Sequence, residues 1–253
     1  MLGRDRVRIL DRMLRMVLPV AVGGGDPPRQ LADGLWVVAR DLRFPPALRM
    51  PNHMTLMRRR DGRLLVHAPV RLEHELLFAV RGLGDVAAII APNTFHYRFV
   101  AEWVREFPQA ELFAAPGLAQ RVPSLPASVP LSDTPPAAWA GEVEQIVFGP
   151  VGPFSEVAFL HLATRTLLLS DLAFHMVRFE SPIQKVCWRL MGVPEGFGPS
   201  RTARLTLLRD RQAARPYLQR IAAWDFDRII VAHGEVIESG GSARFHSAFA
   251  GYL

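Results

Sequence analysis

Two series of short apolar strands, each accompanied by helices, constrain the fold of this chain more than any other feature of its sequence. Residues 86–91 (VAAIIA) typify the first series, because a continuous run of small and β-branched side chains is the pattern of a strand buried on both faces. Hydrophobic periodicity predicts the remaining elements. Strands are expected at residues 35–39, 54–57, 64–68, 86–91 and 111–115, and helices at residues 72–83 and 95–107.

The second series repeats this combination of elements. Strands are expected at residues 143–148, 157–163, 166–170 and 228–232, and a helix at residues 203–224 with an interruption at Pro216. The proline-rich stretch 116–136 between the two series is expected to be irregular. Because each series supplies strands for one sheet and helices to cover it, we predict an α/β (α+β) fold arranged as an αββα sandwich. The absence of a G-x-G-x-x-G motif after the first strand argues against a doubly wound Rossmann sheet.

The composition excludes several other classes of protein. No stretch reaches the roughly 18 apolar residues that a membrane-spanning helix requires. The single thiol, Cys187, excludes an intrachain disulfide and a cysteine zinc cage. The net charge is +6, but the arginines are scattered and most have an acidic neighbour. We therefore expect no nucleic-acid partner, and either a cytoplasmic location or peripheral attachment to the inner face of a membrane.

Residues 1–25 are predicted to form a basic arm ahead of the main domain, which comprises residues 26–253. In a helix, Arg4, Arg8, Arg12 and Arg15 would lie on one side, opposite an apolar side. Pro19 and the glycines that follow it would end this helix and form a hinge. Two roles stay open: packing on the same chain or on another subunit of a homo-oligomer, and binding of residues 4–18 to an anionic membrane surface. An export signal is disfavoured, because the apolar stretch is short and no clear cleavage site follows it.

Several candidate ligands for a metal ion stand at the ends of predicted strands. His67, His96 and His233 end a strand or begin the next helix, and Asp171 ends another strand. Side chains at strand ends project into the crevice where α/β proteins bind ligands. Two imidazoles and one carboxylate that meet there would form a three-ligand metal site with an open position for water.

Five segments, in order and spacing, resemble the metallo-β-lactamase superfamily. They are GLWVVA, RDGRLLVHAP, IIAPNTFHYRFVAEW, TLLLSDLAF and IIVAHGEVI, and the resemblance covers roughly residues 31–237. The family fold is an αββα sandwich, which agrees with the prediction from periodicity. The third segment stands where the superfamily carries its HxHxDH metal motif, and the last stands where it usually carries VLPGHG.

The metal motifs of the superfamily are only partly present. Ala91 and Asn93 occupy the positions of the first two histidines, and Phe95 occupies the position of the aspartate. A later histidine, expected near residues 151–152, is missing. The residues that match are His96, Asp171 and His233. The resemblance therefore implies at most one divalent ion, zinc or else iron or manganese, held by these three residues. His67 and His175 are candidates for a fourth ligand, and His161 is a weaker one.

Two functions remain open at this stage. The first is a metal-dependent hydrolase that cleaves an ester, amide or phosphoester in a small-molecule substrate. The second is a non-catalytic ligand-binding or scaffold protein without a cofactor, in which the three residues form a hydrogen-bonded cluster. The segment 175–203 is predicted to be an insertion near the crevice. It would serve as a substrate wall in which Arg178, Arg189 or Arg201 holds an acidic group, or as an oligomer contact or a locally packed loop.

Overall fold

The computed structural model describes residues 20–21, 24–44, 48–190 and 192–253. The helix predicted in the N-terminal arm lies outside these residues. Within the described residues, no helix has both the length and the apolar character needed to cross a membrane.

The strands of the first series form an eight-stranded sheet. Its order is β1-β3-β4-β5-β6-β7-β8, with β2 also paired to β3. The pairs from β1 to β5 are antiparallel, whereas β5, β6, β7 and β8 run parallel to one another. The strands are β1 (Val20–Ala21), β2 (Arg29–Ala32), β3 (Leu35–Phe44), β4 (Leu48–Arg58), β5 (Leu64–His67), β6 (Val86–Ala91), β7 (Glu111–Ala114) and β8 (Val129–Pro130).

The second series forms a four-stranded sheet with the order β14-β11-β10-β9. Its strands are β9 (Val143–Val151), β10 (Phe154–His161), β11 (Thr166–Leu169) and β14 (Arg228–Val231). Strands β9, β10 and β11 form an antiparallel meander, and β14 returns parallel to β11.

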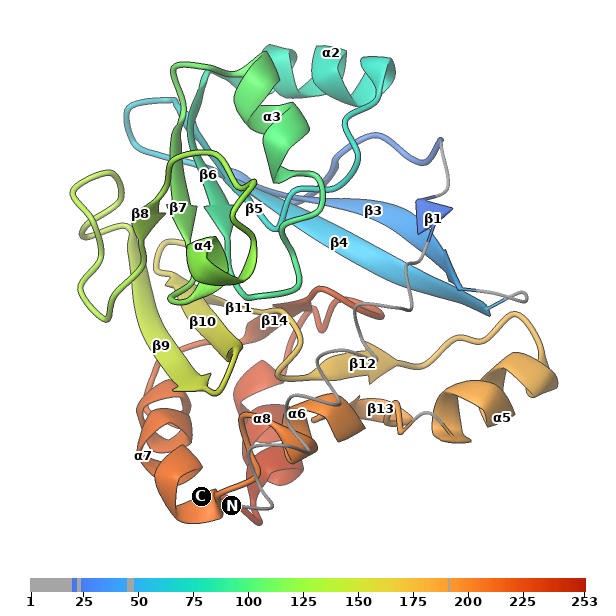
Figure 1. Ribbon diagram of the computed structural model, residues 1–253. Helices are drawn as coiled ribbons and strands as arrows, with labels where there is room; N and C mark the ends of the chain where they lie inside the picture. Colours follow the sequence, from blue (N-terminus) through green and yellow to red (C-terminus); the bar gives the residue numbers. More distant parts are fainter. Residues whose placement is uncertain (1–19, 22–23, 45–47, 191) are drawn as a thin grey trace.

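The two sheets pack face to face, and helices cover both outer faces (Figure 1). Alternation along the strands explains this arrangement, because successive side chains point to opposite faces. In β11, Leu168 packs between the sheets, while Leu167 and Leu169 pack against the helices on the outside. In β5, Leu65 faces the inter-sheet core and its neighbours face outward. The αββα sandwich predicted from the sequence is therefore confirmed.

The helices differ from the predictions mainly at their ends. The outer face of the eight-stranded sheet carries α2 (His74–Leu83), α3 (Val100–Glu106) and the short α4 (Leu118–Arg121). The four-stranded sheet carries α6 (Arg201–Leu205), α7 (Arg211–Ala222) and α8 (Gly241–Phe249). The stretch 116–136, predicted to be irregular, thus contains α4 and β8, and α8 was not predicted.

The helix predicted over residues 203–224 is interrupted, but the predicted position of the interruption, Pro216, is wrong. The chain forms α6 and α7 with a break between them, and the break precedes Pro216, which lies inside α7. The reason is local capping. The Asp210 carboxylate accepts hydrogen bonds from the backbone N–H groups of Gln212 and Ala213, which favours a new helix start at this position.

The segment 175–203 packs against the extended β3–β4 hairpin. It contributes the end of β12 (Phe174–Met176), then α5 (Pro182–Leu190), β13 (Gly196–Gly198) and the start of α6. Strands β12 and β13 pair with each other. The side chains of Gln184 and Trp188 both donate to the carbonyl oxygen of Arg49, at 3.0 and 3.3 Å. These contacts place α5 beside the hairpin (Figure 1).

Candidate metal centre

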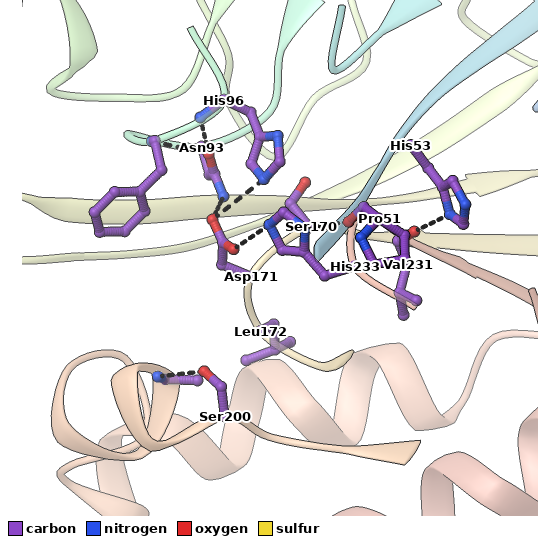
Figure 2. A network of polar contacts seen from close by, with 12 residues as sticks. Pro51, His53, Asn93, His96, Ser170, Asp171, Leu172, Ser200, Val231 and His233 are labelled. Carbon is purple, nitrogen blue, oxygen red and sulfur yellow. Dashed lines mark hydrogen bonds and ion pairs between the residues drawn. The ribbon is translucent and has the colours of Figure 1, made fainter. Parts of the chain in front are cut away.

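His96, Asp171 and His233 meet at one edge of the sandwich. The Nε2 atoms of His96 and His233 lie 3.4 Å and 3.3 Å from the two carboxylate oxygens of Asp171. The candidate ligand atoms of all three residues lie within 4.8 Å of one another. Figure 2 shows both imidazole rings pointing toward the Asp171 carboxylate. The sequence prediction that these three side chains converge is therefore confirmed.

Strand direction explains this convergence. Asp171 follows the carboxyl end of β11, and His233 follows the carboxyl end of the parallel strand β14. His96 follows the carboxyl end of β6 in the facing sheet. In each case an apolar strand ends and the next residues carry polar side chains into the loops at that edge.

The backbone fixes the orientation of the His233 ring. Its Nδ1 donates to the carbonyl oxygen of Pro51 at 2.8 Å, so Nε2 is the ring nitrogen that faces Asp171. The following residue, Gly234, has a φ of +112°, and a Cβ built there would lie 2.0 Å from the carbonyl oxygen of His175. Glycine is therefore required at position 234 for this close approach.

Asn93 organises the loop that carries His96. Its Oδ1 accepts hydrogen bonds from the backbone N–H groups of Phe95 and His96, at 2.9 and 2.7 Å. Its Nδ2 donates to the Asp171 carboxylate at 2.6 Å. The sequence analysis treated Asn93 as a lost histidine ligand. In the structure its amide supports both the backbone of one candidate ligand and the carboxylate of another.

Glu156 is a functional candidate that the sequence analysis missed. Its buried carboxylate accepts three hydrogen bonds of 2.8–2.9 Å from the backbone N–H groups of Ser170, Asp171 and Leu172. Burial and then repulsion by Asp171 raise the pKa of Glu156 to about 7, against the lowering effect of the three N–H donors. Glu156 holds the turn that presents Asp171. The sequence feature that could have identified Glu156 is its position as the single acidic residue in the mostly apolar strand β10.

The Asp171 carboxyl is held in its ionised form. Burial by itself would raise its pKa, but attraction to His96 and hydrogen bonds from both histidines outweigh that effect. The pKa of Asp171 consequently lies well below its usual range. The site thus presents a carboxylate between two imidazoles.

The histidines considered for a fourth ligand do not join this group, and those predictions are wrong. His67 ends β5 and faces the inter-sheet core, where its ring packs edge-on against Phe159. His175 lies in β12, where its Nδ1 donates to the carbonyl oxygen of Glu235. His161 ends β10, at the edge of the sheet opposite Asp171, because β10 and β11 are antiparallel. Among the described residues, the only cluster of potential metal ligands is His96, Asp171 and His233.

A pocket of about 620 Å³ opens above the three residues. All three candidate ligands, His96, Asp171 and His233, line this pocket. The segment 175–203 contributes Trp188, Val193, Ser200, Arg201 and Thr202 to its wall. Of the arginines predicted to hold an acidic group, Arg201 lines the pocket, whereas Arg178 and Arg189 are not among its lining residues. Arg98 and Arg121 also line it, and the sequence analysis did not single them out.

The three side chains fit a single divalent ion. Tetrahedral zinc with bonds of about 2.0–2.1 Å places its ligand atoms roughly 3.3 Å apart. The nitrogen–oxygen separations of 3.3 and 3.4 Å, one to each oxygen of the Asp171 carboxylate, are close to this value, and the three candidate ligand atoms lie within 4.8 Å of one another. Asn52 also lines the pocket, and its buried Oδ1 atom has no hydrogen-bond partner in the described part of the chain.

Comparisons with solved structures identify the fold. A metallo-β-lactamase from Erythrobacter litoralis matches with a TM-score of 0.62 at 11% identity, covering 92% of this chain and 100% of that one. The metallo-β-lactamase FIM-1 from Pseudomonas aeruginosa, in its mono-zinc form, matches with a TM-score of 0.57 at 10% identity, covering 94% and 97%. A flavoprotein from Thermotoga maritima matches with a TM-score of 0.63 at 9% identity, covering 92% of this chain and 61% of that one.

Comparisons of sequence are less informative about function. No curated protein matches the chain. A family described as "Domain of unknown function (DUF4336)" matches residues 35–187, which contain most of the eight-stranded sheet and two of the three candidate ligands. The chain therefore belongs to the DUF4336 family and has the metallo-β-lactamase fold.

Proposed function

We propose that the protein binds one divalent metal ion, preferentially zinc, through His96, Asp171 and His233, and hydrolyses an ester, amide or phosphoester. The observation that carries this proposal is the convergence of two imidazoles and one carboxylate at the base of a pocket large enough for a small molecule. The mono-zinc form of FIM-1 supports the single ion, because it has the same fold.

The surrounding residues position the ligands for this role. A divalent ion at this position would polarise the scissile group and lower the pKa of a water molecule. The carbonyl oxygen of Pro51 keeps the proton of His233 on Nδ1 and directs Nε2 inward. Asn93 and Glu156 fix the Asp171 carboxylate from the side chain and from the backbone, respectively. Such outer contacts tune metal affinity in known sites.

Metal analysis of the full-length protein tests the proposal. After incubation with zinc, manganese or iron and removal of the excess, the protein should retain about one ion per chain. His233→Ala and Asp171→Asn should each lower retention at least tenfold. His246→Ala, which removes an exposed imidazole from α8, is the matched control and should retain the ion. Retention of no metal by the unchanged protein would refute the proposal.

Hydrolysis is tested on the same preparations. p-Nitrophenyl esters, anilides and bis(p-nitrophenyl) phosphate represent the three substrate classes. We expect turnover of one class that is lost with the ion and with Asp171→Asn but kept in His246→Ala. Equal turnover by the Asp171→Asn variant would contradict the assigned role of this residue.

A non-catalytic binding protein is the second candidate, and one observation favours it. The Nδ2 atom of Asn93 donates to an Asp171 oxygen at 2.6 Å, so that oxygen is already occupied by a hydrogen bond. In this alternative, the two histidines and Asn93 hold the partly buried Asp171 carboxylate by polar contacts, without an ion. It would be supported by a metal-free protein that nevertheless binds a ligand in the pocket.

Membrane attachment through residues 4–18 stays a prediction, as does the cytoplasmic location. Co-sedimentation with anionic vesicles should decrease when residues 1–25 are removed. Equal co-sedimentation of the two forms would contradict the membrane role.

A further inference from the structure

The walls of the pocket above the metal centre combine apolar surface with cationic groups. The apolar and aromatic side chains come from the β3–β4 hairpin, from the loop that carries His96, from the start of β12 and from the segment 175–203. They are Leu42, Phe44, Met50, Phe95, Phe99, Phe174, Trp188 and Val193. The volume of about 620 Å³ lies within the roughly 300–1,000 Å³ typical of small-molecule sites. Such a wall favours a bulky or elongated apolar group.

The charged groups in the same wall are almost all positive. Arg98, Arg121 and Arg201 line the pocket, and among its described lining residues Asp171 is the only acid. The guanidinium of Arg121 lies 4.9 Å from the ring centroid of Phe95, and that of Arg98 lies 5.7 Å from the ring centroid of Phe99. Two of the three cations therefore lie against aromatic rings of the wall. Guanidinium groups bind carboxylates and phosphates with directed pairs of hydrogen bonds.

We infer that this pocket binds an amphiphilic anion, with an apolar chain or ring system against the aromatic wall and a carboxylate or phosphate at the arginines. The inference deepens the proposed function, and rests on it in taking the pocket above His96, Asp171 and His233 as the substrate site. It names the substrate class: an acidic amphiphile.

Helix α5 is consistent with a ligand of this kind. Trp188 points inward from this helix and lines the pocket, while Ile183, Val186 and Leu190 are exposed on its outer side, at 76%, 56% and 75%. The inner side of α5 offers apolar contacts to a ligand in the pocket, and its outer side offers apolar contacts to a lipid layer. The ligand can therefore come from solution or from a lipid layer. Both sources present the same chemistry, an anion attached to an apolar body.

Calorimetric titration of the full-length protein with octanoate, decanoate and dodecanoate, below their micelle concentrations, tests the inference. Affinity should rise roughly fourfold per added methylene group, because each buried methylene contributes about 0.8 kcal/mol. Dodecanol, which keeps the chain and lacks the charge, should bind at least roughly tenfold more weakly than dodecanoate. Equal affinity for the acid and the alcohol, or no dependence on chain length, would overturn the inference.

Paired variants assign the binding to this pocket. Arg201→Gln should weaken dodecanoate binding roughly fivefold to tenfold and leave dodecanol binding unchanged. Arg204→Gln, on the same helix but not among the lining residues, is the matched control and should bind both as the unchanged protein does. Trp188→Ala should weaken both ligands, with Ile183→Ala on the outer side of α5 as its control. Identical behaviour of the Arg201 and Arg204 variants would also overturn the inference.

A vesicle experiment separates the two sources. Binding of monomeric dodecanoate identifies a free amphiphile, whereas binding only to vesicles that contain phosphatidylglycerol, lost in Arg201→Gln, identifies a lipid headgroup. Either result supports the inference, and binding of neither overturns it. The metal content of the same preparations keeps the two proposals apart. Dodecanoate binding by a metal-free protein refutes only the metal-dependent hydrolase, and a metal-loaded protein that binds no amphiphile refutes only this inference.

Discussion

Replacing His67 with leucine should make the protein more resistant to acid. His67 is buried between the two sheets, and its Nε2 atom has no hydrogen-bond partner in the described part of the chain. Burial, followed by repulsion from His96, lowers the pKa of this imidazole from 6.5 to about 3. The folded protein consequently keeps His67 neutral at pH values where the unfolded chain takes up a proton.

The sign and size of the effect follow from this difference. Because the folded pKa lies below the unfolded one, the contribution to stability is fully present above pH 6.5 and is lost as the pH falls toward 3. At pH 5 the pH lies 1.5 units below the unfolded pKa of 6.5. Protonation of this imidazole therefore stabilises the unfolded chain by about 2 kcal/mol relative to the folded protein. Burial lowers the pKa of His53 to about 4, so this residue adds a similar loss. Together they remove about 4 kcal/mol, a large part of the stability of a typical domain.

Urea unfolding at pH 8 and pH 5 measures the prediction. His67→Leu should gain about 2 kcal/mol relative to the unchanged protein between pH 8 and pH 5. The edge-on contact with Phe159 is lost at both pH values, so it cancels in this comparison. His246→Leu controls for the removal of an exposed imidazole. A difference between His67→Leu and the unchanged protein that is the same at both pH values, to within about 0.5 kcal/mol, would refute the reasoning.

Three further changes probe the supports of the centre. Gly234→Ala should destabilise the fold by about 3 kcal/mol or more and lower metal retention, because its Cβ would collide with the carbonyl oxygen of His175. Urea unfolding measures the stability and metal analysis measures the retention. A loss of stability below about 1 kcal/mol would contradict the close approach. Glu156→Ala should cost about 3 kcal/mol in urea unfolding, because three buried N–H groups lose their acceptor, and an unchanged midpoint would contradict its assigned role. Asn93→Asp keeps the acceptor oxygen but places a charge beside Asp171, so we expect a loss of about 2 kcal/mol at pH 8 that exceeds the loss in Asn93→Ser.

Much of the fold was predictable because its strands are buried on both faces. Runs such as residues 86–91 and 229–232 are apolar throughout, and this pattern distinguishes them from the surrounding turns. The β3–β4 hairpin was predicted too short, since Arg40, Asn52 and His53 interrupt its hydrophobic pattern. These polar side chains are nevertheless buried, at 3–8% exposure, by contacts with distant segments. Local periodicity does not contain such tertiary contacts.

The candidate ligands were predictable for a different reason. His96, Asp171 and His233 follow strands that a sequence pattern identifies, and parallel strands bring their carboxyl ends to one edge. Two of the supports, Pro51 and Glu156, were not predictable, because they act through backbone groups. Pro51 contributes a carbonyl oxygen to His233. Glu156 accepts hydrogen bonds from three backbone N–H groups in the turn that follows β11. Neither contact requires a recognisable motif at the position that supplies it.

Two residues that stand where the resemblance places metal ligands make contacts of their own at the site. Asn93 stands at a histidine position, yet its amide joins the loop of His96 to the carboxylate of Asp171. Phe95 stands at the aspartate position, yet its ring stacks on Phe154 and carries Arg121 at the pocket wall. Both residues stand where the resemblance places a metal ligand, and both instead make contacts that hold the loop around His96. These contacts are the structural support for the proposed single-ion centre, and the pocket wall is the support for the proposed acidic ligand.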